Sequence, residues 1–397
     1  MRPIVGGNVP PDRVVGRDEF ISKMWAALED QSIVLVSERR IGKTSVLKKM
    51  FKEPREGWRP IYMPIQSVNS PIEFVGQIID AVTAAFKAKG RVVRPLQRIL
   101  GELAGERVGT WTIPQLANRW KRLLADIMQD IQENCEQRIV FLWDELPLMI
   151  SNIMDVHGTR LAMELLDVLR DHRLKDEKGT LRMVFTGSIG LHLVVSELLK
   201  NGYRNDPTND MVTYSMEGLE PQHARELARQ GLEGLIELGD LKAADSIDEI
   251  AKAIAKLTDG LPYYVNYAVS RLAECRQPIQ VGEVEGAVNS LLLDPEDTAH
   301  FSHFTERIEV YYQFDEQAQE LAFAILRVLC RKRSLLSEKG IWDSVSLDMP
   351  LTNRDFFQKT LALLIKDHYL IRGERKGERA YRFKYRITQE WWLKNRG

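Results

Sequence analysis

The stretch Ser32-Ile-Val-Leu-Val-Ser-Glu-Arg-Arg-Ile-Gly-Lys-Thr-Ser45 decides the fold of this chain. It starts as a short apolar run, passes through a polar loop, and continues into an amphipathic segment at 46–51. This order predicts a buried strand, a loop and a helix. The loop fits the pattern GxxxxGK(S/T) except at its first position, where Ser37 replaces glycine. In such a loop, backbone N–H groups and the helix N-terminus converge on one phosphate group.

The residues of this loop have distinct expected roles toward a bound nucleotide. Lys43 adds a cation to the β- and γ-phosphate oxygens, Thr44 holds Mg²⁺, and Ser45 lies beside the α-phosphate. The expected nucleotide contacts in the loop and the first helical turn are Arg40, Ile41, Gly42, Lys43, Thr44 and Ser45. The alternative interpretation is a Gly-Lys-Thr triplet that occurs by chance at a helix start.

The missing glycine has an expected consequence of its own. If the first position of the loop needs a positive φ, Ser37 has to bear strain or shift the loop. Either change would slow turnover more than it weakens nucleotide binding.

A second motif, Arg138-Ile-Val-Phe-Leu-Trp-Asp-Glu145, has the pattern of an apolar strand that ends in two acids. Asp144 is expected to hold the metal through water, and Glu145 to orient and deprotonate the water that attacks the γ-phosphate. The alternative is that the two carboxylates cap the following segment. Together with the phosphate loop on a separate strand, the motif predicts a P-loop NTPase of the additional-strand type, with Lys43 and Glu145 as catalytic residues.

Short apolar runs and amphipathic segments alternate through the first 215 residues. This alternation predicts an α/β fold, a parallel sheet with helices on both faces. The expected strands are 32–36, 60–65, 138–143, 182–186 and 211–215. Between the second and third strands, the excursion at 87–112, rich in Arg and Gly, predicts either an accessory helical piece or a loop.

After the α/β part the periodicity becomes helical. Apolar residues recur at helical spacing in 223–238, 247–257 and 263–275, which predicts an all-α lid. The last part has the pattern of three helices followed by two strands, which predicts a winged helix; these elements are 316–331, 337–344, 353–368 and the strands around 373–377. The expected domains are a P-loop ATPase domain, a helical lid and a winged-helix domain, at 1–218, 219–294 and 295–397.

The composition excludes several classes of protein. Of the 397 residues, 44% are hydrophobic and 28% charged, and the net charge is −1, which argues against disorder and against a uniformly basic coat. The cysteines Cys135, Cys275 and Cys330 fit neither a disulfide framework nor a CxxC metal site, so a reducing compartment is expected. Because the chain lacks a secretion signal and a run of 18 apolar residues, we expect a cytoplasmic protein without a membrane partner.

Several segments together resemble one known family. They are Val15-Gly-Arg-Asp18, Arg39-Arg-Ile-Gly-Lys-Thr-Ser45, Leu142-Trp-Asp-Glu145, Thr186-Gly-Ser188 and Gly260-Leu-Pro262. With these segments the chain resembles the AAA-related archaeal-type ATPases, neighbours of the STAND switch ATPases and of the Orc1/Cdc6 initiators. The resemblance covers roughly residues 12–275, and the winged-helix tail is similar in kind. It implies ATP or ADP and Mg²⁺ as cofactors.

The resemblance also implies roles for residues outside the phosphate loop. Three residues would lie beside the adenine: Val15, Gly16 and Arg17. Pro262 would close on the base from the lid, and either Thr186 or Ser188 would sense the γ-phosphate. A hydroxyl at the carboxyl end of a parallel strand beside the loop can reach the attacking water, which independently favours a catalytic role for Thr186. The alternatives are a simple turn in Thr-Gly-Ser and a plain helix break at Gly260-Leu-Pro262.

An arginine finger is not evident in the sequence. Arg204, in the polar loop after the helix that follows the fourth strand, is a candidate that would reach the nucleotide of a neighbouring subunit in a homo-oligomer. The alternative is a solvated loop arginine. If the finger is supplied only on assembly, the isolated chain should hydrolyse slowly, because such an arginine contributes roughly 10³ or more in rate.

The C-terminal tail carries a local basic patch. Residues 364–397 contain ten basic and four acidic side chains. On a winged helix the wing would meet DNA phosphates through Arg375, Lys376 and Arg379. The third helix would face a major groove through Asn353, Arg354 and Lys359, although much of this helix is apolar and STAND-type winged domains often dock on their own ATPase part.

These patterns predict a switch that binds ATP, hydrolyses it in the presence of Mg²⁺, and relays the nucleotide state through the winged helix to a protein or DNA partner. The alternative is a DNA-binding regulator, or a transposition or defence accessory, in which the nucleotide is structural and turnover negligible.

Overall fold

The computed structural model describes residues 2–7, 9–87, 119–188, 190–275, 278–312, 316–349 and 353–397. The predicted excursion at 87–112 lies outside the described residues beyond Lys87. By their contacts, the residues divide into two compact units. The sheet unit comprises Pro10–Val36 and Lys43–Met216. The C-terminal unit comprises Met1–Val9, Ser37–Gly42 and Glu217–Gly397.

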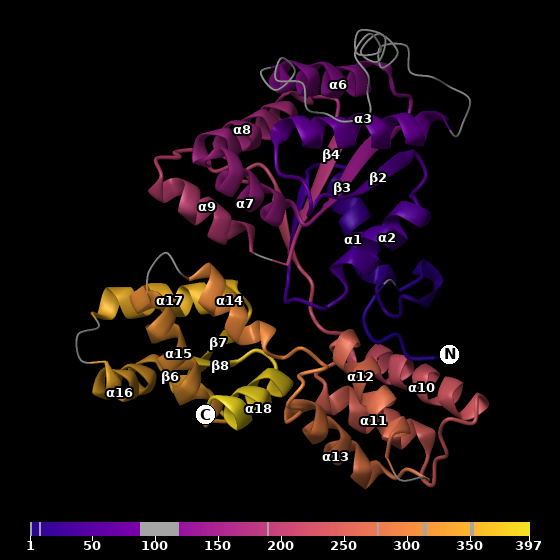
Figure 1. Ribbon diagram of the computed structural model, residues 1–397, viewed down its shortest axis with the longest axis vertical. Helices are drawn as coiled ribbons and strands as arrows, with labels where there is room; N and C mark the ends of the chain where they lie inside the picture. Colours follow the sequence, from indigo (N-terminus) through magenta and orange to yellow (C-terminus); the bar gives the residue numbers. More distant parts are fainter. Residues whose placement is uncertain are drawn as a thin grey trace. The chain divides into compact units, whose positions relative to one another are not determined.

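The sheet unit contains the predicted parallel sheet (Figure 1). Its strands are β1 (Ile33–Val36), β2 (Trp58–Pro64), β3 (Arg138–Asp144), β4 (Leu181–Thr186) and β5 (Val212–Ser215). They lie in the order β2-β3-β4-β1-β5, and all neighbours are parallel. Strand β4 therefore lies between β1 and β3. It is the additional strand that the two motifs predict.

Helices flank this sheet (Figure 1). They are η1 (Pro11–Arg13), α1 (Asp18–Leu28), α2 (Lys43–Lys52), α3 (Pro71–Lys87), α6 (Trp120–Asn134), α7 (Leu146–His157), α8 (Thr159–Lys175) and α9 (Leu191–Lys200). Because helices cover it, β4 is buried along its whole length, as a strand in a covered parallel sheet should be. Trp143 has no exposed surface and stacks between the rings of Phe141 and Phe185, at centroid distances of 5.4 and 5.6 Å.

The register of the sheet brings the ends of three strands to one level. Asp144, the last residue of β3, pairs with Thr186, the last residue of β4. Thr186 in turn pairs with Leu35, one residue before β1 ends and the phosphate loop begins. In a parallel sheet, ligands bind outside the carboxyl ends of the strands where the strand order reverses. The two predicted motifs therefore meet at this carboxyl edge.

The first part of the C-terminal unit is helical. It contains α10 (Pro221–Glu237), α11 (Ile247–Leu257), α12 (Pro262–Ala273) and α13 (Val281–Leu292), which pack against one another. The predicted helices at 223–238, 247–257 and 263–275 correspond to the first three of these, and α13 is an additional helix.

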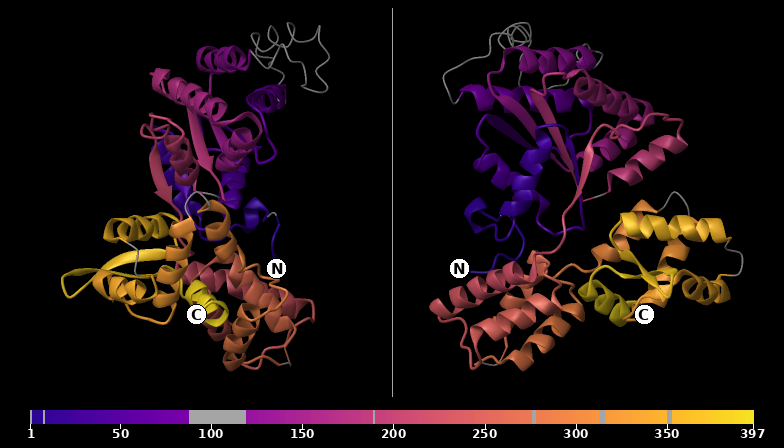
Figure 2. Two further views of the ribbon diagram at one scale, coloured as in Figure 1. Left: turned by 60° about the vertical axis from the view of Figure 1, so that its left-hand side comes forward. Right: turned by 180° about the vertical axis from the view of Figure 1, so that it is seen from behind.

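The second part of the C-terminal unit follows the predicted order of elements. Its elements are α14 (His303–Tyr311), α15 (Glu316–Cys330), β6 (Leu336–Ser337), α16 (Glu338–Asp348), α17 (Arg354–Lys366), β7 (Leu370–Arg375), β8 (Glu378–Phe383) and α18 (Arg386–Asn395). Strands β7 and β8 form an antiparallel hairpin, and β6 pairs with β8 on the other side (yellow hairpin in Figure 2). The sequence does not predict helix α14, the short strand β6 or the last helix α18.

Stacked aromatic rings join the two parts of the C-terminal unit. Phe301 stacks on Tyr264 of α12 at 4.4 Å and on Trp391 of α18 at 6.3 Å. All three side chains are buried, so this stack belongs to the core of the unit. In the part of the chain that the structure describes, none of the helices has the length and apolarity needed to cross a membrane.

Candidate functional site

Thr44 and Asp144 meet at the carboxyl edge of the sheet. Helix α2 begins at Lys43, so Thr44 lies in its first turn, while Asp144 ends β3. The Thr44 hydroxyl donates a hydrogen bond to Asp144 Oδ2 at 2.7 Å. Because the proton of Thr44 points to the carboxylate, a lone pair of its oxygen remains free for a cation. The structure thus brings together the two residues predicted to hold the metal.

A tyrosine that the sequence analysis missed completes this contact. The Tyr62 hydroxyl, from the neighbouring strand β2, donates to the same Asp144 oxygen at 3.1 Å. Burial raises the pKa of Tyr62, and the charge of Asp144 raises it further. Tyr62 therefore stays a neutral donor that fixes the orientation of the carboxylate. Only the pairing of β2 with β3 places Tyr62 here, and the sequence does not specify that pairing.

The donor set at this edge suits magnesium. Mg²⁺ prefers hard oxygen ligands and is commonly bound by one or two protein groups together with water and substrate phosphates. Thr44 offers a hydroxyl oxygen, and Asp144 a carboxylate that is 5% exposed and oriented by two donors. These two residues would hold the ion.

Glu145 stands at the turn between β3 and α7, and its backbone is unusual. It has a φ of 69°, in the left-handed region that non-glycine residues rarely adopt. Its carboxylate Oε2 accepts hydrogen bonds from the backbone N–H and from the hydroxyl of Ser188, at 2.7 and 2.8 Å. The carboxylate is therefore tied to the segment that follows β4.

The structure separates the two candidate sensors, Thr186 and Ser188. Ser188 is engaged with Glu145. Thr186 is 2% exposed, and its Oγ1 is buried without a hydrogen-bond partner among the described residues. A buried hydroxyl without a partner is unfavourable unless a ligand or water satisfies it. This geometry suits Thr186, rather than Ser188, for contact with a bound group.

The remaining residues of the sheet unit that are predicted to contact the nucleotide lie at the N-termini of α1 and α2. Lys43 and Ser45 belong to the first turn of α2, and Lys43 is 7% exposed. Val15 and Gly16 precede α1, and Arg17 is its N-cap residue. Gly16 has a φ of 67° and Arg17 is 6% exposed. Their contact with adenine stays a prediction.

The phosphate loop has positive φ angles at Arg40 and Gly42. Arg40 of this loop has a φ of 66°, in the region that non-glycine residues rarely adopt, whereas the φ of Ser37 is not positive. Ser37 therefore carries no positive-φ strain, and the other expected consequence, a shifted loop, stays a prediction. Gly42 has a φ of 102°, which only glycine adopts readily, so the second glycine of the motif has a conformational reason.

Arg40 is anchored by contacts within the C-terminal unit. Its guanidinium donates to the carbonyl oxygen of Ala299 at 2.8 Å and lies 4.3 Å from the ring centre of Tyr263. Tyr263 follows Pro262, which occupies the first turn of α12. The first turn of this helix therefore contacts the phosphate loop. Ile41, which precedes Gly42, is fully buried.

The backbone conformation at position 260, in the segment before Pro262, also requires glycine. The φ of Gly260 is 65°, and a Cβ at this position would lie 2.3 Å from the carbonyl oxygen of Leu219. The helical structure breaks here between α11 and α12, as the alternative interpretation of Gly260-Leu-Pro262 requires, and contact of Pro262 with a base stays a prediction.

A buried ion-pair network reaches the loop through Glu38. Glu38 Oε1 pairs with Arg307 of α14 at 2.5 Å, and Arg307 lies 3.8 Å from Asp367. Tyr312 donates to Asp367 Oδ2 at 2.6 Å. The side chains of Glu38, Arg307 and Asp367 are at most 7% exposed. This network could not be predicted, because nothing in a single sequence pairs residues 269 positions apart.

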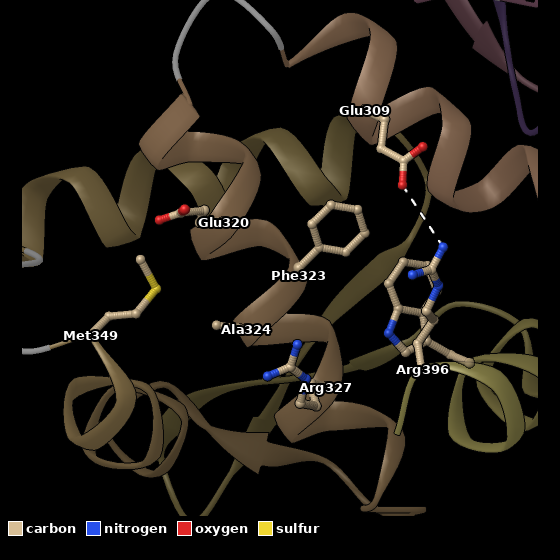
Figure 3. A pocket seen from close by; sticks show the side chains of 8 residues that line it. Glu309, Glu320, Phe323, Ala324, Arg327, Met349 and Arg396 are labelled. Carbon is tan, nitrogen blue, oxygen red and sulfur yellow. Dashed lines mark ion pairs between the residues drawn. The ribbon is translucent and has the colours of Figure 1, made fainter.

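A cavity in the C-terminal unit is a poor candidate for a nucleotide (Figure 3). It measures about 390 Å³ and is lined by Glu309, Glu320, Phe323, Ala324, Arg327, Met349, Trp392 and Arg396. Glu309 pairs with Arg396 at 3.8 Å, and Glu320 adds a second carboxylate. Arg327 and Arg396 balance these two acids, so the lining offers a phosphate chain no surplus of positive charge. Arg204, the candidate finger, is exposed in the loop after α9, and contact with a neighbouring subunit stays a prediction.

Comparisons with known proteins place the fold. No family model matches the sequence, and no curated protein matches it. The structure is similar to the Walker-type ATPase of Pyrococcus abyssi, with a TM-score of 0.65 and 14% identity, over 98% of this chain and 99% of that chain. Since 14% identity is low, this similarity shows the fold alone.

Two further solved structures are more distant. The RuvB Holliday junction branch migration motor of Thermotoga maritima has a TM-score of 0.36 and 12% identity, over 92% of each chain. A STAND protein with a tetratricopeptide repeat sensor from Pyrococcus horikoshii has a TM-score of 0.35 and 16% identity, over 99% of this chain and 44% of that chain.

Proposed function

We propose that this chain, which has the fold of a Walker-type ATPase, binds ATP with Mg²⁺ and hydrolyses it. The observation that carries the proposal is the hydrogen bond of 2.7 Å between Thr44 and Asp144, which joins the two predicted motifs at the carboxyl edge of the sheet. A helix N-terminus and a preceding loop of backbone N–H groups favour a phosphate chain. The oxygen ligands of Thr44 and Asp144 favour the metal that accompanies it.

The residues divide the chemistry between them. The loop residues Arg40, Ile41 and Gly42 and the first turn of α2 bind the phosphates, while Lys43 neutralises charge on the β- and γ-phosphate oxygens. Thr44 and Asp144 would hold Mg²⁺, which when bound would supply positive charge beside the phosphates. Glu145 accepts the proton of the attacking water, and Thr186, with its unsatisfied buried hydroxyl, orients that water or a γ-phosphate oxygen.

We infer that hydrolysis serves a switch with the three predicted domains, at 1–218, 219–294 and 295–397. The loop Ser37–Gly42 is covalently continuous with Lys43, and Arg40 and Glu38 contact Tyr263 and Arg307 of the C-terminal unit. A loop that moves with the γ-phosphate would therefore change contacts made by the lid and α14. A ligand shifts such an equilibrium only through different contacts in the two states.

We further propose that the second part of the C-terminal unit is a winged helix that reaches a partner. Its hairpin tip, with Arg375, Lys376 and Arg379 exposed, is the surface proposed for DNA phosphates. On α17, Lys359 pairs with Asp355 at 2.7 Å, and on the hairpin Arg375 and Arg379 lie opposite Glu378 and Glu374. If DNA binds, fluorescence anisotropy with a labelled duplex should show affinity that falls with salt. Binding that persists unchanged in high salt, or its absence, would instead leave a protein partner as the target.

Phosphate release with ATP and Mg²⁺ tests the main proposal. We expect wild type to hydrolyse ATP, Lys43→Ala to lose both binding and turnover, and Glu145→Gln to bind ATP but turn over about 10²–10⁴-fold more slowly. Lys52→Ala, at the other end of α2, and Glu133→Gln on α6 are matched controls that should leave activity unchanged. Hydrolysis that survives both site substitutions would disprove the site.

Mass spectrometry of the purified protein supplies a second measurement. Bound ADP or ATP in wild type, and its loss in Lys43→Ala, would support the nucleotide site. If wild type keeps a nucleotide but releases no phosphate, the chain is a binder with a structural nucleotide, and the hydrolysis part of the proposal fails.

A further inference from the structure

We propose that Ser188 is a positioning residue for Glu145: it holds one carboxylate oxygen, Oε2, so that the other oxygen, Oε1, accepts the proton of the attacking water. The inference rests on the proposed ATP hydrolysis and extends it to a residue that would otherwise be assigned to phosphate sensing. It concerns the sheet unit alone.

The geometry of the contact supports a clamp, by which we mean the two hydrogen bonds from Ser188 that hold Glu145 Oε2. The N–H and the hydroxyl of Ser188 both donate to Glu145 Oε2, at 2.7 and 2.8 Å. Two donors on one oxygen fix the rotation of the carboxylate about its last bond and occupy the lone pairs of that oxygen. Among the described residues, neither of these bonds reaches Oε1, so its lone pairs remain available as a base.

The backbone of Glu145 supports the same conclusion. Its φ of 69° is unfavourable for a residue with a Cβ, by roughly 1–2 kcal/mol for L-amino acids in this region. Glycine or asparagine would relieve this strain if the turn were the only requirement. A strained glutamate persists where the surrounding structure holds it, and strain of this kind clusters at functional sites. The two hydrogen bonds from Ser188 hold its side chain, and the N–H of Met149 donates to its carbonyl oxygen at 3.1 Å.

The neighbouring hydroxyl of Thr186 shows that the two residues of Thr186-Gly-Ser188 are not equivalent. Thr186 Oγ1 has no partner among the described residues and lies on the strand position that pairs with Asp144. Ser188 lies two residues beyond the end of β4 and is engaged with Glu145. Thr186 is therefore free for the bound group, and Ser188 acts on the base.

The reaction step defines what the clamp contributes. The water oxygen forms a bond to the γ-phosphorus, and the bond from that phosphorus to the β–γ bridging oxygen breaks, so that ADP leaves. The water proton passes to Glu145 Oε1. A carboxylate that rotates freely presents this oxygen to the water for only part of the time, so loss of the clamp lowers turnover without weakening substrate binding.

The substitution Ser188→Ala tests this step. It removes the hydroxyl donor and keeps the backbone N–H. Because hydrogen bonds to charged groups are among the stronger ones, we expect kcat to fall about 10- to 100-fold, with KM and the Kd for ATP unchanged. Ser188→Thr, which keeps the hydroxyl, should restore most of the rate. Thr186→Val should differ from Ser188→Ala by changing KM or the Kd for ATP as well as kcat, because it removes a hydroxyl assigned to the bound phosphate or water.

A double-mutant cycle distinguishes positioning from a general structural effect. In the Glu145→Gln background, Ser188→Ala should cause no further loss, because the base that Ser188 positions is already absent. Ser188→Cys, with a weak donor, should give an intermediate rate and serves as a second variant if Ser188→Ala fails to fold. The thermal midpoint and the Kd for ATP check the folding of each variant.

The outcomes separate this inference from the proposed function. If wild type hydrolyses ATP and Glu145→Gln stops it, but Ser188→Ala keeps or raises kcat, the inference fails and the function stands. An equal loss in both backgrounds, or a rise in KM with kcat unchanged, also overturns it. If wild type binds ATP without turnover, the proposed function fails, and the inference fails with it.

Discussion

Two clusters of carboxylates in this molecule are stabilised in different ways. At the carboxyl edge of the sheet unit, Asp144 and Glu145 accept hydrogen bonds from the neutral donors Thr44, Tyr62 and Ser188. In the C-terminal unit, Glu38 and Asp367 face the guanidinium of Arg307, in a group that is almost fully buried. Neutral donors orient a carboxylate without cancelling its charge, so Asp144 can still attract a cation. The charge of Glu38 is already balanced, and its role is structural.

The largest effect is expected where full charges are buried. Arg307→Met leaves Glu38 and Asp367 without a counter-charge in the core. Removal of one partner from a buried ion pair typically destabilises a protein by about 3–5 kcal/mol. Chemical denaturation of the whole chain should show that Arg307→Met lowers the free energy of unfolding by about this amount. The double variant Glu38→Gln with Arg307→Met should recover part of it.

An exposed pair provides the control for this prediction. Arg396 pairs with Glu309, and both side chains are about half exposed. Arg396→Met should leave the free energy of unfolding close to that of wild type, because exposed pairs contribute little. If Arg307→Met is as mild as Arg396→Met, the contrast between the two clusters does not hold.

The next effect concerns the oriented carboxylate and should appear in function rather than in stability. Tyr62→Phe removes one donor to Asp144 and leaves its charge in place. Groups that orient metal ligands typically change metal affinity or activity by about 10- to 100-fold. We therefore expect the Mg²⁺ concentration for half-maximal hydrolysis to rise by about this factor.

The sheet unit contains a matched tyrosine for comparison. Tyr203 donates to Asp167 at 2.9 Å, and burial raises its pKa just as burial raises that of Tyr62. Tyr203→Phe should leave the Mg²⁺ dependence unchanged. An equal change in both variants would mean that Tyr62 acts through general stability and not through Asp144.

A third prediction uses a half-buried carboxylate that has no cationic partner at hydrogen-bond distance in the contacts described. Asp259 Oδ2 accepts from the backbone N–H of Ile387 at 2.8 Å, and burial raises the pKa of Asp259 from 3.8 to about 6. Because its pKa is raised in the folded state, the contribution of Asp259 to the free energy of unfolding is most favourable below pH 4 and declines as the pH rises through about 6. Asp259→Asn should therefore stabilise the protein at pH 7, by about 1–3 kcal/mol.

The pH dependence checks the sign of this prediction. The difference between Asp259→Asn and wild type should shrink toward zero as the pH falls from about 6 to below 4. Asp294, whose pKa is lowered by its hydrogen bond to Thr298, is the opposite case. Asp294→Asn should be destabilising above pH 4. Stabilisation by Asp259→Asn that is independent of pH would contradict the ionisation argument.

The sequence predicts the sheet, the two motifs and the helical periodicities, because each is written in consecutive residues. The strands at 138–143 and 182–186 are continuous apolar runs, and both are confirmed within one or two residues. What the sequence could not provide is pairing over long distances. The contact of Tyr62 with Asp144 depends on which strands are neighbours, and the contact of Glu38 with Arg307 joins a loop to a helix far along the chain.

The backbone of the phosphate loop shows a subtler limit. A motif specifies where glycine usually stands but not which φ each residue adopts in a given chain. Because Ser37 replaces a glycine, the pattern predicts either strain at Ser37 or a shifted loop. The positive φ is at Arg40, a position that the pattern leaves open. The contacts of Arg40 with Ala299 and Tyr263 are tertiary, and they hold a conformation that local preference disfavours.

The smallest predicted effect tests this assignment of strain. Arg40→Gly and Arg40→Ala both remove the contacts of the guanidinium, so their difference isolates the backbone. Because alanine bears the steric penalty at a φ of 66° and glycine does not, Arg40→Gly should be more stable than Arg40→Ala by about 1 kcal/mol. Ser37→Gly should bring no such gain, since Ser37 lies outside the positive-φ region and glycine only adds freedom to the unfolded chain. If thermal denaturation shows instead that Ser37→Gly stabilises and the two Arg40 variants are equal, the strain lies at Ser37 after all.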